Sequence, residues 1–216
     1  MPGSSPGMTA LGAVTPLETH RVPRFHGAMF TVFRGGQSGA WRVKRFAGVK
    51  GESLAPTPSL SVTHSDSIAL PILPSQAGWR LVGAPSHVRY VERTEKEQLT
   101  AVQAGLGRPE AKLAALIPIR KSAAWWELTQ EERRKIFEDK SHHIASSMRF
   151  LPAIARQLYH CRDLGGAFDF LTWFEYRLAH ESLFEELVGM LRETEEWSYV
   201  EREVDIRVER ERLDAI

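Results

Sequence analysis

The sequence predicts an α+β fold made of two ferredoxin-like halves, and three observations support this prediction. Between Ile117 and Arg207 the local patterns follow the order strand, helix, strand, strand, helix, strand, which is the order of a split βαβ unit. Residues 199–208 alternate apolar and charged side chains, as a strand with one buried face does. The first half of the chain holds similar segments in a less regular order, so we expect a second, related half.

The first half is predicted to contain two strand pairs and a helix. Residues 30–33 and 41–46 flank the turn GGQSG and indicate a hairpin, and residues 79–82 and 87–92 flank GAPS in the same way. Residues 52–77 are rich in Ser, Pro and Thr, which predicts a loop with one weak strand at residues 68–70.

A helix is expected from Thr94 to about Ala104, followed by a break at Gly105, Gly107 and Pro109. This break divides the chain into an N-terminal half over residues 29–108 and a C-terminal half over residues 109–216. Residues 1–28 are rich in Pro, Gly and Ser in their opening stretch and are expected to be a disordered leader or a tag.

The second half is more regular than the first. Thr129 and Glu132 form a T-x-x-E capping box that predicts a helix running to about Met148. The remaining elements are each expected from hydrophobic periodicity, and they are a strand at 116–120, strands at 153–162 and 168–176 around a glycine turn, a helix at 181–192 and a closing strand at 199–208.

Composition excludes several classes of protein. The 216 residues are 43% hydrophobic and 25% charged with a net charge of +1, so neither a nucleic-acid partner nor a membrane surface is indicated. The single cysteine, Cys161, excludes an internal disulfide and a thiolate metal cluster. The leader lacks the basic and apolar regions of a secretory signal, so the cytoplasm is the expected location.

Two adjacent histidines and one arginine are candidate site residues. His142 falls nearly opposite the apolar stripe of the predicted helix, whereas His143 lies at the edge of that stripe, as a half-buried structural histidine or a ligand would. Arg156 shares a strand face with Ile154 and Leu158. A buried arginine needs an anionic partner, which could be Glu175 on the following strand or a bound anion.

Other candidates are weaker when each is taken alone. Trp125 and Trp126 precede the capped helix and are interpreted as core residues or as the wall of a cofactor pocket. Glu195 and Glu196 are expected at the end of the last helix, where acidic side chains oppose the helix dipole. One of these carboxylates could therefore orient a metal-bound histidine, although a solvated acidic pair is the simpler interpretation.

Long stretches of the chain closely resemble the chlorite dismutase family. They are FTVFRGGQSGAW, VERTEKEQLTAVQAGLGR, ALIPIRKSAAWWELTQEERRKIFEDKSHHIASSMRFLPAIARQLYHCRDLGGAFDFLTWFEY and FEELVGMLRETEEWSYVEREVDIRV. The resemblance begins near Met29 and is greatest to the short, dimeric branch of the family. It implies two ferredoxin-like halves in a dimeric α/β-barrel, with haem b in the C-terminal half.

The resemblance also assigns roles to individual residues. His143 matches the iron ligand, Glu196 (or its neighbour Glu195) the acid that hydrogen-bonds this histidine, and Arg156 the arginine on the opposite, distal side of the haem. Further residues match positions around the haem, with Tyr90, Lys121 and Trp125 near its propionates, Trp126 in the pocket and Gln103 at the pocket entrance.

The reaction that the resemblance implies is the conversion of chlorite to chloride and dioxygen, by way of a hypochlorite-level species. Arg156 would attract the anion and retain that species. Three alternatives are considered. A coprohaem decarboxylase of the same superfamily carries an uncharged residue at the position of Arg156. A haem carrier or sensor leaves a buried arginine unexplained. A peroxidase requires a distal acid–base pair, which is not evident beside Arg156.

Overall fold

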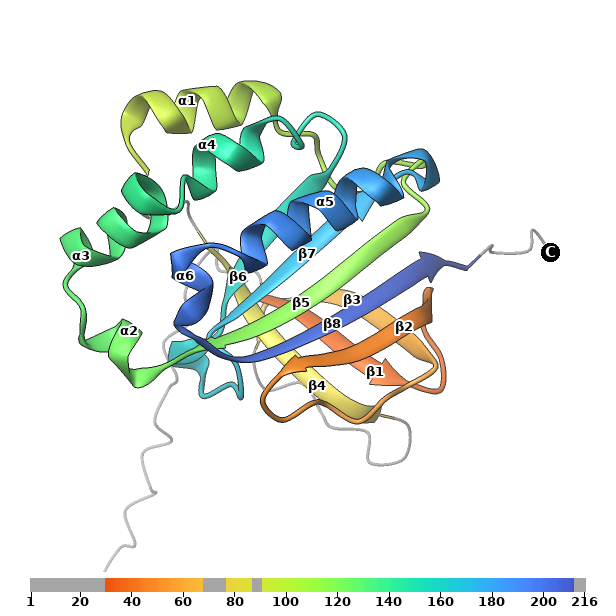
Figure 1. The fold of residues 1–216 in the computed structure, drawn as a ribbon. Helices are drawn as coiled ribbons and strands as arrows, with labels where there is room; N and C mark the ends of the chain where they lie inside the picture. The colour runs from red at the N-terminus through yellow and green to blue at the C-terminus, as the bar shows by residue number, and fades with distance from the viewer. Residues whose placement is uncertain (1–29, 68–76, 87–90, 212–216) are drawn as a thin grey trace, which may run out of the picture.

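A computed structural model describes residues 30–67, 77–86 and 91–211. Eight antiparallel strands close into a barrel in the order β1-β3-β2-β8-β5-β7-β6-β4 (Figure 1). The combination of this barrel with several helices confirms the predicted α+β class. The predicted leader at 1–28, the weak strand at 68–70 and most of the strand expected at 87–92 lie outside the described residues.

The strands fall into two groups along the chain. The first group is β1 (Phe30–Gly36), β2 (Trp41–Lys50), β3 (Ser59–Ser65) and β4 (Ala77–Pro85). The second group is β5 (Leu113–Lys121), β6 (Ala155–His160), β7 (Phe170–Tyr176) and β8 (Val200–Arg210). Within the barrel the groups lie in the orders β4-β1-β3-β2 and β8-β5-β7-β6, so both halves have the same strand order.

The helices are mostly short. They are α1 (Arg93–Val102), α2 (Ala123–Glu127), α3 (Gln130–Arg134), α4 (His143–Met148), α5 (Glu181–Arg192) and α6 (Glu195–Ser198). A π-helical segment, Lys135–Lys140, joins α3 to α4, and 3-10 turns occupy Arg162–Leu164 and Leu178–His180. Among the described residues no helix has both the length and the apolar character needed to span a membrane.

The second group of strands is buried on both faces, and β5 shows why. Ala114 and Leu116 point into the barrel, where they join a core with Phe33, Trp173 and Ile206. The intervening side chains of β5 point outward into a second core, formed with α5. Since alternate residues of a strand face opposite sides, burial of both sides explains the unbroken apolar run LAALIPI.

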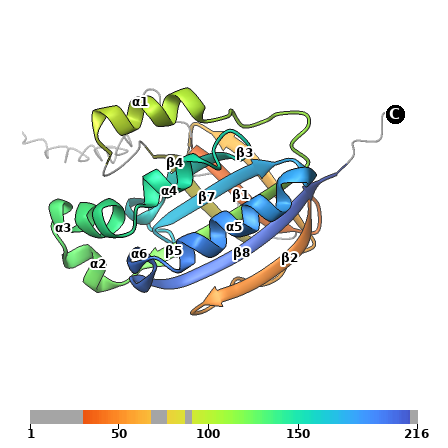
Figure 2. The same cartoon turned by 45° about the horizontal axis from the view of Figure 1, so that its top comes forward.

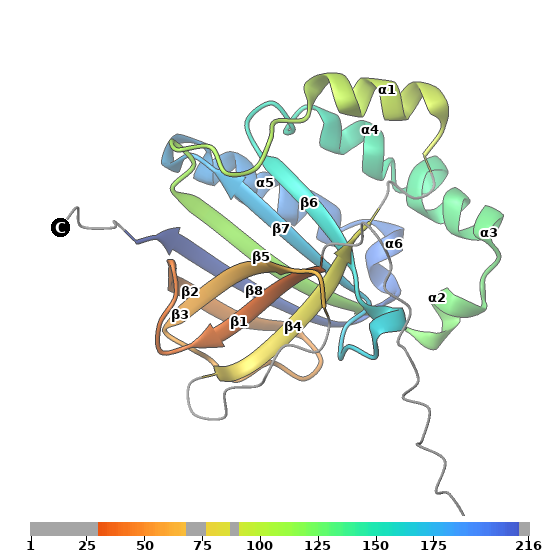
Figure 3. The same ribbon diagram turned by 180° about the vertical axis from the view of Figure 1, so that it is seen from behind.

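The helices cover the outer face of this second group. Figures 1 and 2 show α4 and α5 lying over the strands β5, β6 and β7, with α1 beside α4. Seen from behind in Figure 3, strands β1 to β4 form the opposite side of the barrel. The helix predicted at 181–192 is confirmed as α5, and its apolar stripe, which includes Phe184 and Leu187, packs on the outer core.

Two predictions for the first half are wrong. The strands at 30–33 and 41–46 do not form a hairpin, because β3 lies between β1 and β2 and pairs with both. Residues 52–77 do contain a strand, as expected, but the strand that the structure describes there is β3 at Ser59–Ser65, a segment that was expected to be loop. The Ser- and Thr-rich composition of this segment concealed a strand whose Leu60 is fully buried in the barrel.

The long helix predicted from Thr129 to Met148 is also wrong as a single element. Its capping box is present, because Glu132 and Thr129 exchange hydrogen bonds at the start of α3. The chain then passes through the π-helical segment and breaks at His142, which has a left-handed backbone with φ of 48°. His143 therefore begins a helix rather than ending one.

The barrel closes at a seam between β4 and β6. Ala84 and Pro85 of β4 pair with His160 and Tyr159 of β6, and the N–H of the next residue, Ser86, donates to the Leu158 carbonyl at 2.9 Å. This seam lies next to the cavity described below.

Candidate functional site

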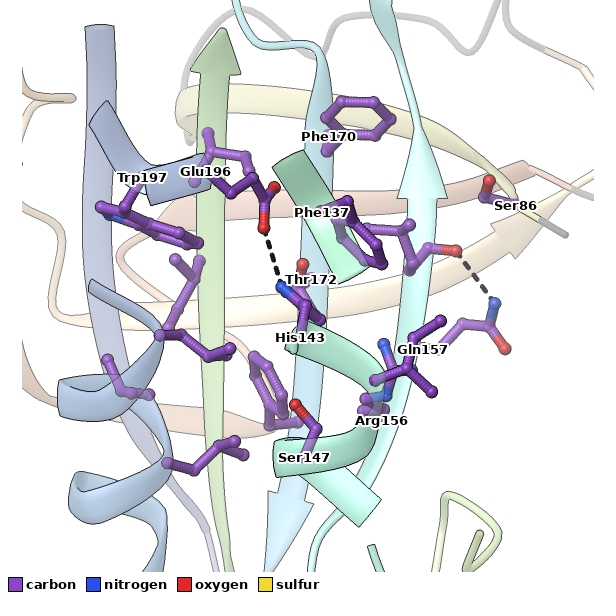
Figure 4. A pocket seen from close by; sticks show the side chains of 18 of the residues that line it. Ser86, Phe137, His143, Ser147, Arg156, Gln157, Phe170, Thr172, Glu196 and Trp197 are labelled. Atoms are coloured by element: carbon purple, nitrogen blue, oxygen red, sulfur yellow. Dashed lines mark hydrogen bonds and ion pairs between the residues drawn. The ribbon is translucent and has the colours of Figure 1, made fainter. Parts of the chain in front are cut away.

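A cavity of about 390 Å³ lies between the outer face of the C-terminal strands and the helices α4 and α5. Most of its wall is apolar. The strands contribute Ile117, Ile119, Leu158, Phe170 and Phe174, the helices contribute Ile144, Leu187, Val188 and Leu191, and the turn after α4 contributes Leu151. Figure 4 shows that a few polar side chains, including His143, Arg156 and Glu196, enter this apolar space.

His143 enters the cavity from the first turn of α4 and is held from two sides. Its Nδ1 lies 2.8 Å from Oε2 of Glu196, and its ring stacks on Phe137 with 4.2 Å between centroids. A carboxylate at Nδ1 fixes the tautomer in which this nitrogen carries the proton. The Nε2 lone pair is then available for a metal ion.

The start of α4 is set by Glu138 in the preceding π-helical segment. The Glu138 carboxylate accepts the backbone N–H groups of Ile144 and Ala145 at 2.6 and 3.2 Å. These are N–H groups of the first turn of α4, which lack partners within the helix. Together with the left-handed backbone of His142, this cap determines where His143 stands. His142 itself is exposed, as predicted.

Glu196 is buried, with 5% of its surface exposed, and the expectation that it ends a helix is wrong. Helix α5 ends at Arg192, and Glu195 and Glu196 lie in the first turn of the separate helix α6, so neither acid opposes a helix dipole. Glu196, and not Glu195, is the acid beside the histidine, because Glu195 is exposed and its carboxylate pairs with the Lys140 ammonium at 2.9 Å.

Lys121 is buried, with 3% of its surface exposed. Its ammonium lies 2.7 Å from Oε1 of Glu196 and is 4.6 Å from the ring centroid of Trp125. Burial by itself raises the pKa of the Glu196 carboxyl, but Lys121 and His143 outweigh it and lower that pKa to about 2. Glu196 is therefore a carboxylate shared between a cation and the histidine.

Arg156 enters the cavity from β6, on the face that also carries Ile154 and Leu158, as predicted. The ion pair considered with Glu175 is excluded, because Glu175 stands opposite Ala155 and accepts the indole N–H of Trp173. Within the described residues the guanidinium has no carboxylate partner, and its buried Nε has no hydrogen bond. Burial lowers the pKa of Arg156. Such a cation requires a bound anion.

Comparison with known proteins identifies the family. A family model described as chlorite dismutase matches residues 74–211. The chain belongs to the chlorite dismutase family. A curated chlorite dismutase from Ideonella dechloratans is 33% identical over 97 residues, which cover 44% of this chain and 33% of that protein. The match thus spans about a third of the length of this curated relative.

Solved structures agree with this assignment. A crystal structure of a dimeric chlorite dismutase from Nitrobacter winogradskyi is 64% identical and superposes with a TM-score of 0.76, covering 84% of this chain and 99% of that one. A mutant chlorite dismutase from Candidatus Nitrospira defluvii, solved with cyanide, is 18% identical with a TM-score of 0.63, covering 86% of this chain and 92% of that one. At this identity the second likeness concerns the fold alone.

The other residues matched to the chlorite dismutase pattern lie at different distances from the cavity. Gln103 lines its edge and donates a hydrogen bond from Nε2 to the Arg156 carbonyl at 2.9 Å. Trp125 lines the wall and is 2% exposed. Trp126 stands behind the wall, where its ring stacks on Phe170 and its Nε1 donates to Asp169. Tyr90 lies outside the described residues.

Several residues of this site have no clear signal in the sequence. Phe137 carries only the helical spacing of an apolar residue. The capping role of Glu138 depends on a helix break at a residue other than glycine, which no local pattern indicates. Trp197 also lines the cavity. A large aromatic residue directly after two acids was the one signal that could have found it.

The lowered pKa of Glu196 predicts how stability depends on pH. A carboxyl whose pKa is about 2 in the folded protein, against an ordinary value of 4.5, stabilises the fold above about pH 4.5 and loses this contribution as the pH falls toward 2. The full effect is about 3 kcal/mol. We expect the difference in unfolding free energy between wild type and Glu196→Gln to be largest near pH 7 and to shrink toward pH 3, measured by urea denaturation.

The neighbouring carboxylate provides the control for this measurement. Glu195 is exposed and contacts only Lys140 among the charged groups that the structure describes, so Glu195→Gln should change stability little at any pH. An equal pH dependence in both variants would show that Glu196 is not the coupled group.

Proposed function

We propose that this chain binds haem b in the cavity and decomposes chlorite to chloride and dioxygen. The observation that carries the proposal is a single cavity holding both a histidine fixed by a carboxylate and an arginine without a partner among the described residues. Membership of the chlorite dismutase family supports the reaction, which balances as one chlorite ion giving one chloride ion and one dioxygen molecule.

The donor set suits haem better than a bare metal ion. Among the described residues no three His, Cys, Asp or Glu side chains gather to hold a metal, so a bare metal ion would find too few protein ligands here. Haem would need only one, His143, because its macrocycle supplies most of the iron ligands. The apolar wall also matches an apolar macrocycle. When bound, haem supplies the redox chemistry that breaks Cl–O bonds and joins the oxygen atoms.

His143 and Glu196 form the side of the site that holds the iron. Glu196 accepts the Nδ1–H of His143, which increases the basicity of the imidazole and its donation through Nε2. Lys121 binds the other carboxylate oxygen, and the contacts with His143 and Lys121 together keep the buried acid ionised. The stack on Phe137 limits rotation of the ring.

Arg156 forms the anion-binding side. Its charge is permanent, and in an apolar cavity one cation attracts an anion more strongly than it would in water. It draws chlorite into the cavity and retains a hypochlorite-level product until oxygen forms. An uncharged residue would be expected here in a coprohaem decarboxylase, and a carrier or sensor would leave the unpaired guanidinium without a function.

The haem ligand is tested with the two adjacent histidines. His143→Ala should greatly weaken haem binding, because it removes the only histidine that the described structure brings into the cavity. His142→Asn is the matched control, since asparagine tolerates the left-handed backbone of this position, and it should bind haem as wild type does. The measurement is a haem titration followed by the Soret band. Equal loss in both variants would refute the assignment.

Oxygen evolution on adding chlorite to the haem-loaded protein tests the activity itself. Arg156→Ala should keep its fold and its haem but bind anions at the iron more weakly by about 1.5–3 kcal/mol, as expected for a lost charged hydrogen bond. Oxygen yield per haem before inactivation should fall, and a hypochlorite trap should restore part of it.

The control for Arg156 is Arg149→Ala, at the C-terminal end of α4. Arg149 is exposed and pairs with Glu186, so its loss should leave the oxygen yield unchanged. Absence of oxygen from haem-loaded wild type would overturn the proposed reaction. A wild-type yield from Arg156→Ala, with no effect of the trap, would overturn only the role of Arg156.

We further propose that the two groups of strands are ferredoxin-like halves, that haem lies in the C-terminal half, and that the chain forms a homodimer. The shared strand order supports the first point, and the likeness to a protein described as dimeric supports the last. Light scattering at micromolar concentration should give the mass of two chains. A monomer or a pentamer would contradict this expectation.

A further inference from the structure

The contacts of Glu196 continue beyond Lys121 to a tryptophan. The Lys121 ammonium lies between two indole rings, 4.6 Å from the centroid of Trp125 and 5.6 Å from that of Trp197. Trp197 follows Glu196 directly in the chain and lines the same cavity (Figure 4). Its ring thus faces the cation that neutralises part of the charge on Glu196.

Trp197 is itself held by a buried carboxylate of β8. Its Nε1 donates a hydrogen bond of 2.9 Å to Oε2 of Glu203, whose side chain is 1% exposed. The other oxygen of Glu203 accepts the Nε–H of Arg192 at 2.8 Å. Arg192 also bonds Asp205, which pairs with Arg207. Because every charge in this cluster has a partner, Glu203 is a fixed anchor for the indole.

We propose that Trp197, anchored by Glu203, is a positioning residue that holds the Lys121 ammonium on Glu196 and thereby limits the negative charge that Glu196 presents to His143. The inference rests on the proposed haem function, since its measurable effect is on iron bound to His143. No part of the proposed reaction requires Trp197 to contact haem or chlorite.

The physical basis is the flexibility of lysine. A lysine side chain has four rotatable methylene groups, and here two aromatic faces confine its ammonium beside the acceptors Oε1 and the backbone carbonyl of Glu196. While Lys121 stays there, the charge of Glu196 is divided between the ammonium and the Nδ1–H of His143. If Lys121 moves away, Glu196 still accepts the Nδ1–H of His143. More of its charge then acts on this group, and the imidazole donates more strongly to iron.

Loss of the indole that holds Lys121 should change the midpoint potential of the bound iron in a definite direction. Trp197→Leu in the haem-loaded protein should shift the ferric/ferrous midpoint potential downward, because a stronger donor favours ferric iron. Lys121→Met should shift it in the same direction by a larger amount. The stretching frequency of the iron–histidine bond in the ferrous protein, measured by resonance Raman spectroscopy, should rise in both variants.

The decisive experiment is a double-mutant cycle with these two substitutions. If Trp197 acts through Lys121, adding Trp197→Leu to Lys121→Met should cause no further shift of the potential. If Trp197→Leu shifts the potential by the same amount in the Lys121→Met background as in the wild-type background, the proposal is overturned. If Trp197→Leu does not hold haem, Trp197→Phe serves in the same cycle, because it keeps a ring over Lys121 and removes only the N–H that Glu203 accepts.

Asp205→Asn is the matched control. It removes a charge from the same buried cluster and a partner of Arg192, but Asp205 does not contact Trp197 in the described structure. It should leave the potential and the Raman frequency unchanged, and a shift as large as that of Trp197→Leu would also overturn the proposal. Failure of wild type to bind haem through His143 would refute the proposed function. Normal haem binding with independent shifts from the two substitutions would refute only the role of Trp197.

Discussion

The site depends on one buried carboxylate. Glu196 sits where three elements meet, and its two oxygens bind Lys121 from the end of β5 and His143 from the start of α4. Its backbone N–H is accepted by Ser141 just before the helix break. A buried carboxylate is costly unless it is paired, so these contacts stabilise one another. The contacts that keep the acid ionised also orient the histidine. The stability of this region and the geometry of the site therefore depend on the same contacts.

The two faces of the strands β5 to β8 have different roles because these strands belong to a closed barrel. Strands β5 to β8 bury side chains on both faces, so one face completes the barrel core while the other faces α4 and α5 and forms the cavity wall. The alternation that makes β6 a strand also separates Arg156, which enters the cavity, from Ala155, which points into the barrel. A shift of one residue in β6 would bury the cation in the barrel interior.

The sequence predicted those features that depend on periodicity. The element order of the second half, the exposure of His142 and the face occupied by Arg156 all follow from spacing along one strand or helix. The features that it missed depend on contacts between distant segments. The burial of Lys121 requires Glu196, 75 residues away. The break before His143 requires a left-handed histidine and the Glu138 cap, and a continuous helical pattern conceals both. The strand β3 is hidden by its polar composition and is revealed only by its two neighbours in the barrel.

The two sides of the cavity are held by contacts of different strength. The Arg156 carbonyl accepts a neutral hydrogen bond from the side chain of Gln103, which caps the C-terminal end of α1. His143 is held by a buried carboxylate that is itself paired with Lys121, and hydrogen bonds to charged groups contribute more than neutral ones. These contacts favour local opening at the arginine over the histidine. Mild denaturation should accordingly release the segment around Arg156 before the segment around His143.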